Sequence, residues 1–268
     1  MTRTLDMHGL GVLITRPEGR NGDLQAALEG AGARVCVQPL LDIQPLADSE
    51  PEWQASRRRL MDLDLYRHLI FISVNAVEQG LLRIESLWPQ WPQGIQCYGV
   101  GEATRAALAN CGLPLQLVDS VGANDSESLL ACPSLQNVAG DGVLIVRGVG
   151  GRETLATKLR ERGARVDYAE CYRRRPVAHA AERLAEIFRA GEVEVVCLNS
   201  GDTLKYFCEC TDTALRGQLA VVVPGARVAR LAQDAGFQQV LCAENAGTAA
   251  TLAAITQWLR EKHVGTRR

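Results

Sequence analysis

The sequence lacks long apolar runs and has almost no excess of one charge sign. Its 268 residues carry a formal net charge of −2, with 22% of them charged. This balance does not predict nucleic acid or an anionic membrane as the main partner. No stretch of about 18 apolar residues occurs, and the first residues contain no apolar signal-peptide core. With 47% hydrophobic residues, we predict a globular, cytoplasmic protein large enough for two domain cores.

Metal-binding and common catalytic signatures are missing as well. The four histidines lie near no cysteine pair at ligand spacing, so we predict no metal. The nine cysteines are scattered, mostly in apolar runs, which favours reduced core thiols over a disulfide or a metal site. No G-x-S-x-G, G-x-x-x-x-G-K-[ST] or H-E-x-x-H motif occurs, which excludes the commonest hydrolase, NTPase and zinc-protease sites.

An internal repeat is the strongest feature that is present. Residues 11–35 align without a gap with residues 142–166, at an offset of 131, and 12 of the 25 positions are identical. Each copy passes from an apolar run through a turn into a helical pattern and a second strand, which predicts a parallel βαβ unit. Ligands bind where the first strand ends and the helix begins, so Thr15–Arg20 and Val146–Arg152 are expected near a site.

Similar elements follow each copy in the same order. Predicted strands are 69–73, 94–99 and 115–118 in the first half, and 193–198, 219–223 and 240–242 in the second. We therefore predict an α/β protein of two similar domains, each a mostly parallel sheet flanked by helices, from an internal duplication. Two such domains would form a cleft between them, lined by the duplicated loops.

The loops after these strands are rich in amides, small hydroxyl residues and glycine. Helix capping explains any one of them. As a set that recurs in both halves, they would suit a ligand with several carboxylates or phosphates. The members are Arg16, Ser73, Asn75, Gly101, Thr104 and Asn124–Ser126 in the first half, and Arg147, Asn199, Ser200, Gly201, Gly225 and Thr248 in the second.

Two other segments leave alternatives open. Tyr98–Glu102 is similar to the start of a dinucleotide-binding loop but lacks its third glycine, so a dinucleotide-dependent enzyme is a minor alternative. Tyr172 precedes three arginines, Arg173–Arg175. One interpretation places Tyr172 in a solvated strand end. The other places its phenol in the cleft, where it could donate a proton, with the arginines nearby to attract anionic groups of a substrate.

The ordered motifs LITRPEGRNGDLQAALEGAGARV, FISVNAV, YGVGEATRAAL, ECYRRRP and VVPGARVARLAQDAGF resemble those of the uroporphyrinogen-III synthase family. The resemblance covers residues 10–259 and implies two α/β domains joined by a two-stranded connector, at about 35–45 and 166–176. The first domain would comprise 1–37 plus 174–268, and the second 38–173. The repeat alone would have placed a single boundary near Asp141.

The resemblance also implies a reaction. Members of this family are lyases that need no cofactor and cyclise the linear tetrapyrrole hydroxymethylbilane to uroporphyrinogen III, with loss of water and inversion of ring D. This step serves haem, sirohaem and cobalamin biosynthesis. We expect a monomer that makes transient contact with hydroxymethylbilane synthase. The alternative is a non-catalytic two-domain protein that binds an anionic small molecule.

Residue roles follow from the same resemblance. Tyr172 matches the tyrosine proposed to assist loss of the hydroxyl. Thr104 and Thr248 match the threonines of the cleft, and Thr104 is also expected to be catalytic. Asp202 stands where the family usually has a small neutral residue and is expected to face away from substrate. Ile72 and Leu198-Asn199 replace the threonine that often precedes the serine in the family. The substrate-binding residues are expected to be Arg16, Ser73, Asn75, Gly101, Arg147, Ser200, Gly201, Gly225 and Thr248.

Overall fold

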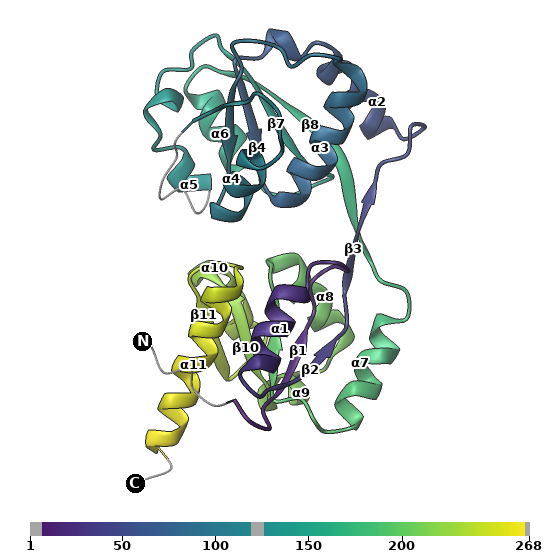
Figure 1. Cartoon of the computed structure of the whole chain (residues 1–268), viewed down its shortest axis with the longest axis vertical. Coiled ribbons are helices and arrows are strands. Elements are labelled where there is room, and N and C mark those ends of the chain that lie inside the picture. Colours follow the sequence, from purple (N-terminus) through teal and green to yellow (C-terminus); the bar gives the residue numbers. More distant parts are fainter. Residues whose placement is uncertain (1–6, 119–125, 266–268) are drawn as a thin grey trace. The chain divides into compact units, whose positions relative to one another are not determined.

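The chain divides into two compact α/β units. A computed structural model describes residues 7–118 and 126–265, and each unit contains its own sheet with helices around it (Figure 1). Unit 1 is Met1–Asp42 with Arg175–Arg268, and unit 2 is Ile43–Arg174. Within the described ranges, no helix is long and apolar enough to cross a membrane.

Sheet A of unit 1 has five parallel strands in the order β11-β10-β9-β1-β2. The strands are β1 (Gly11–Ile14), β2 (Arg34–Val37), β9 (Val195–Cys197), β10 (Ala220–Pro224) and β11 (Gln239–Ala243). The helices are α1 (Gly22–Gly30), α7 (Ala180–Arg189), α8 (Gly201–Cys210), α9 (Thr213–Gln218), α10 (Gly225–Asp234) and α11 (Thr248–Gly265).

Alternation along β1 places a core on each face of sheet A. Val12 and Ile14 pack in one cluster with Leu24 of α1 and Ile255 of α11. Leu13 points the other way, into a cluster formed with α7, α8 and α10. Successive side chains of a strand face opposite sides, so a strand buried on both faces must be apolar throughout.

Sheet B of unit 2 is built on the same plan, with the order β3-β8-β7-β4-β5-β6. Its strands are β3 (Leu41–Pro45), β4 (His68–Phe71), β5 (Gln96–Gly99), β6 (Gln116–Leu117), β7 (Gly142–Gly148) and β8 (Arg165–Pro176). The helices are α2 (Pro51–Met61), α3 (Val74–Leu87), α4 (Glu102–Ala109), α5 (Ser126–Leu129) and α6 (Thr154–Glu161), with short 3-10 turns at Leu63–Leu65 and Pro133–Leu135. Helices α2, α3 and α4 cover one face, and α5 and α6 cover the other.

The predicted fold class, two mostly parallel sheets flanked by helices, is confirmed. Strands β3 and β8 straddle the boundaries between the units and are neighbours in the sheet. The first stretch expected to connect the domains begins within β2, which pairs with β1 and contains the strand predicted from Val35. The second stretch, from about 166, lies within β8, which pairs with β7 from Gly142↔Arg165 onward.

The two copies of the repeat share backbone geometry. Gly19 and Gly150 both have φ +75, and Gly32 and Gly163 have φ +91 and +87, at the same offset of 131. These are turn conformations that glycine adopts at little cost. The repeat therefore preserves the turns, while the side chains around them have diverged.

Gly11 provides a test of how closely β1 packs. A Cβ added at Gly11 would lie 1.5 Å from the carbonyl oxygen of Glu192, whereas at Gly142 the nearest atom, the Leu65 carbonyl oxygen, is 2.8 Å away. We expect Gly11→Ala to lower the free energy of unfolding by about 3 kcal/mol or more, because backbone must move. Gly142→Ala should cost less, and Gly22→Ala, with nothing within 4 Å, should cost nothing measurable. Urea unfolding of the three variants would refute this close packing if Gly11→Ala behaved like Gly22→Ala.

A buried polar network lies at the amino ends of the strands of sheet B. His68 Nδ1 is 2.9 Å from the Tyr98 hydroxyl, and His68 Nε2 is 3.1 Å from Asp141 Oδ2. Burial lowers the pKa of His68, an effect that Arg67 reinforces and Asp141 opposes. The Tyr98 hydroxyl also donates to Gln96 Oε1 over 2.8 Å, so the network extends to a third side chain.

The lowered pKa of His68 predicts a pH dependence of stability. The unfolded chain takes up this proton at a higher pH than the folded chain, so this stabilising contribution is present above about pH 6.5 and declines as the pH falls below it. The free energy of unfolding, measured by urea at pH 7.5 and 5.5, should fall less between these values in His68→Gln than in the parent. A steeper fall in the variant would mean that the charged ring is the stabilising form.

Candidate functional site

The residues singled out from the sequence lie at the carboxyl edges of the two sheets and divide between the units. Most of them lie in the loops or first helical turns that follow parallel strands, which is where such folds bind ligands, while Arg147 and Tyr172 lie within β7 and β8. Unit 1 holds Arg16, Ser200, Gly201, Gly225 and Thr248, and unit 2 holds Ser73, Asn75, Gly101, Thr104, Arg147 and Tyr172. The predicted loop at Asn124–Ser126 lies largely outside the described residues, since positions 119–125 are not described.

Ser73 and Ser200 occupy equivalent positions. Each is the N-cap of the helix that follows a central strand, and its Oγ accepts a hydrogen bond 3.1 Å long, from Ala76 N in one case and Thr203 N in the other. Capping satisfies a helix amide that has no partner within the helix. The Ser200 hydroxyl donates in turn to Thr203 Oγ1, 2.9 Å away, because the Thr203 hydroxyl itself donates to Asn199 Oδ1.

Tyr172 is buried beside Ser73. Its hydroxyl lies 3.0 Å from Ser73 Oγ and accepts a longer bond of 3.4 Å from Arg174 Nη2. A Cβ on Gly148 would approach the Tyr172 ring to 2.6 Å, so glycine at position 148 makes room for the ring. The interpretation of Tyr172 as part of a solvated strand end is therefore wrong, because its side chain is 0% exposed.

The arginines next to Tyr172 do not supply a block of unpaired positive charge. Arg173 Nη2 lies 2.8 Å from Glu50 Oε1 and 3.3 Å from Glu52 Oε1. The guanidinium of Arg174 stacks over the Tyr172 ring, 5.5 Å from its centroid. The positive charge of Arg173, at least, is already neutralised within unit 2.

Arg147 was expected to bind substrate, but its guanidinium is engaged inside unit 2. The residue is 4% exposed and donates to the carbonyl oxygens of Gly148 and Gly150 and to Glu153 Oε1. It also stacks over the Tyr168 ring at 4.3 Å. A buried guanidinium is tolerated only when its donors are satisfied, and this set satisfies them. The geometry favours a structural role, in which Arg147 shapes the loop after β7.

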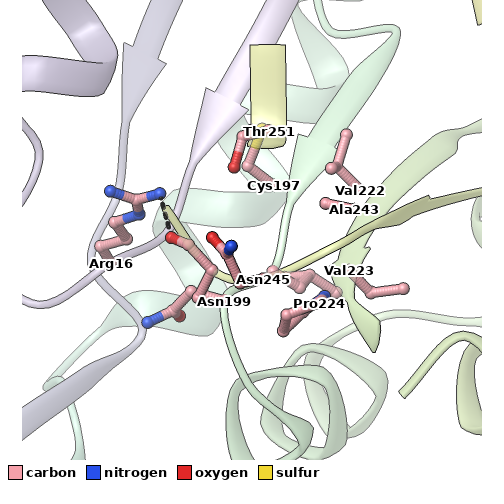
Figure 2. Close-up of a pocket in the computed structure, with 11 residues that line it drawn as sticks. Arg16, Cys197, Asn199, Val222, Val223, Pro224, Ala243, Asn245 and Thr251 are labelled. Carbon is pink, nitrogen blue, oxygen red and sulfur yellow. Dashed lines mark hydrogen bonds between the residues drawn. The ribbon is translucent and has the colours of Figure 1, made fainter. Parts of the chain in front are cut away.

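Arg16 occupies the same position of the repeat but reaches across the fold. Its Nη2 donates to the carbonyl oxygen of Ala246 over 2.7 Å. Figure 2 shows this bond at the left, beside other residues that line a cavity of about 10 Å³, which has room for about one water molecule. Burial lowers the pKa of Arg16, and Cys197 and Asp23 oppose this effect. The cavity is lined by Arg16, Cys197, Leu198, Asn199, Val222, Val223, Pro224, Ala243, Asn245, Ala246 and Thr251.

The loop before α11 is held by its own side chains as well. Asn245 Oδ1 accepts from Gly247 N over 2.8 Å, and Thr251 Oγ1 donates to the Gly247 carbonyl over 2.8 Å. Thr248 is the first residue of the helix that this loop introduces. Asn245 and Thr251 were not among the residues expected from the sequence. An asparagine two residues before a glycine is the signal that could have identified the turn.

The glycines of the loop before α4, and the glycine at the start of α10, have structural explanations. A Cβ on Gly99 would lie 2.9 Å from Arg105 N, so glycine is needed for α4 to approach β5. Gly101 caps α4 with φ +86, and Gly225 begins α10 with φ +70. Thr104 is buried in the first turns of α4, while Asn75 is half-buried in the first turn of α3.

Metal ligands do not gather anywhere in the described ranges. Among residues 7–118 and 126–265, no group of three or more His, Cys, Asp or Glu side chains could hold a metal ion. All nine cysteines lie in these ranges and are free thiols. Burial raises the pKa of Cys97, Cys171 and Cys197 to about 12, as expected for unreactive core thiols.

Comparison with known proteins gives consistent results. The family model described as uroporphyrinogen-III synthase HemD matches residues 22–253. A uroporphyrinogen-III synthase from Proteus mirabilis is 34% identical over 188 residues, which are 70% of this chain and 92% of the relative. The corresponding protein of Escherichia coli K12 is 29% identical over 250 residues, covering 92% of this chain and 100% of the relative.

Solved structures agree with these relatives in fold. A mutant uroporphyrinogen III synthase from the extremely thermophilic bacterium Thermus thermophilus matches with a TM-score of 0.65 at 20% identity, covering 94% of this chain and 99% of the other. The uroporphyrinogen-III synthetase of Helicobacter pylori 26695 matches with a TM-score of 0.56 at 16% identity, covering 93% and 99%. At these identities the likeness concerns the fold alone.

Proposed function

The chain belongs to the uroporphyrinogen-III synthase family, and from this premise we infer that it cyclises hydroxymethylbilane to uroporphyrinogen III. The observation that carries the inference is the family match over residues 22–253. The enzyme is a lyase of tetrapyrrole biosynthesis. The finer steps, loss of water and inversion of ring D, belong to the proposal.

In the proposed reaction, the carboxyl edge of unit 1 binds carboxylates of the substrate. The backbone amides at Gly201 and Gly225 begin helices α8 and α10, whose N-termini attract negative charge. Thr248 adds a hydroxyl donor at the same edge, and the Ser200 hydroxyl would turn to the substrate from its contact with Thr203 Oγ1. In unit 2, Asn75 and the amide of Gly101 have the corresponding task.

Tyr172 and Ser73 are the proposed source of the proton that the leaving hydroxyl needs. The 3.0 Å contact between their oxygens supports this role, because a proton can pass between two hydroxyls at that distance. Ser73 is half-buried at the edge of sheet B, while Tyr172 is enclosed. Tyr172 then acts on the substrate through Ser73, and Thr104 remains a proposed catalytic residue of the same unit.

We further propose that the enzyme works as a monomer and receives its reactive substrate through transient contact with hydroxymethylbilane synthase. Unassisted closure of hydroxymethylbilane gives the uninverted isomer. A short path between the two enzymes would therefore reduce the amount of substrate that closes before it is bound. A cytoplasmic location is also proposed. The nine free thiols fit a reducing compartment.

An isomer assay tests the reaction. Hydroxymethylbilane generated in situ would be mixed with the protein, and the oxidised products separated by chromatography. Mostly uroporphyrin III is expected, because the enzyme must direct ring closure as well as accelerate it. Only isomer I at the rate without enzyme, from folded protein, would reject the reaction. Binding of the bilane without turnover would then leave a binding protein as the function.

Tyr172→Phe tests the proton donor. We expect kcat to fall about ten-fold or more with folding retained, because the ring and its packing remain while the phenol is lost. Tyr98→Phe is the matched control, since it also removes a buried phenol of unit 2 that contacts His68 rather than the site. It should lower stability and leave kcat unchanged. Equal kcat in the parent and Tyr172→Phe would remove Tyr172 from the mechanism.

A further inference from the structure

Three side chains hold the backbone of the loop before α11. Asn245 and Thr251 bind the amide and the carbonyl of Gly247, and both are near neighbours in the sequence. Arg16 binds the carbonyl of Ala246 from 230 residues away. Of these three contacts, that of Arg16 alone ties the loop to another part of the sheet edge.

The sheet order makes this a long-range contact. Strands β9 and β10 separate β1 from β11, so three strand spacings of about 4.8 Å each, roughly 14 Å, separate the ends of β1 and β11. An arginine side chain cannot cover that distance alone. The loop therefore extends over the ends of β9 and β10, where Asn199 and Pro224 line the small cavity (Figure 2).

Comparison with Arg147 shows that the turn itself does not need the guanidinium. Arg147 donates to Gly150 of its own loop. In the first copy, the turn is held by Asn21 instead, whose Nδ2 donates to the carbonyls of Arg16 and Pro17 over 3.3 and 3.2 Å. The side chain of Arg16 is thereby left for the contact with Ala246.

We propose that Arg16 is a positioning residue, which holds the 244–247 loop so that Thr248 and the first turn of α11 face the substrate. This differs from the direct carboxylate contact expected for Arg16 from the sequence. The inference rests on the function proposed for Thr248, but the contact itself can be tested without any substrate.

Hydrogen exchange of Arg16→Gln provides that test. The Gly247 and Thr251 amides are both bonded within the loop and report its order. We expect both to exchange about five-fold faster than in the parent, the effect of losing one exposed hydrogen bond of about 1 kcal/mol. Arg16→Lys should restore part of the protection, because an ammonium group can also donate to one carbonyl.

Arg34→Gln is the matched control. Arg34 lies in the same unit, is exposed, and is 3.9 Å from Glu192. Its loss removes the same charge, and exchange at Gly247 and Thr251 should not change. Amides of sheet B provide the second control and should keep their exchange rates in every variant.

Kinetics separate positioning from direct binding. A loosened loop should lower kcat about five-fold with a smaller change in KM, because orientation is lost. Unchanged exchange with a raised KM would overturn the inference in favour of direct carboxylate binding. Unchanged exchange and unchanged kinetics would also overturn it. If the parent produced only isomer I, the proposed function would fail, while the exchange result would still decide the role of Arg16.

Discussion

The pairing of β1 with β9 is the interaction on which unit 1 depends. Val12 is paired with Val195, and Ile14 with Cys197, so a strand from the N-terminus and a strand from the second half of the chain are neighbours in one sheet. The buried hydroxyl of Thr15 adds a bond of 2.7 Å to the Cys197 carbonyl. Closing so long a loop costs entropy before any contact is gained. Because β9, β10 and β11 follow unit 2 in the chain, sheet A can be completed only after unit 2 has been synthesised. The same pairing places Arg16 beside the ends of β9 and β10.

The strand orders of the two sheets support the predicted duplication, which itself stays an inference. If β7 and β8 are equated with β1 and β2, then β4, β5 and β6 correspond to β9, β10 and β11, and the two orders coincide except for β3, which has no counterpart in sheet A. In unit 2 these segments follow one another along the chain. In unit 1 the first pair comes from the N-terminus and the other three strands from the second half. The copies thus differ in connectivity and keep the arrangement of strands.

Local features of the structure could be predicted from the sequence, and long-range ones could not. Strand β1 and the N-caps Ser73 and Ser200 depend on a few neighbouring residues, whose pattern is visible in the chain. The repeat did not indicate that β1 belongs to sheet A, because the repeat alone would have divided the chain near Asp141. That prediction came from the family resemblance. The roles of Arg16 and Arg147 were also out of reach. They occupy equivalent positions of the repeat, Arg16 just after β1 and Arg147 near the end of β7, and only the fold decides whether the guanidinium meets Ala246 or Gly150.

The charges that remain at the sheet edges bear on how a carboxylate-rich substrate is held. Arg147 is neutralised by Glu153 and Arg173 by Glu50, so neither offers a free cation. In the proposed reaction, helix amides then take over part of the binding that these two arginines do not supply. Fixed amides stabilise anions at little cost in reorganisation, whereas a buried ion pair must be desolvated and later broken. A ring that has to turn during cyclisation is better served by contacts that can be exchanged one at a time.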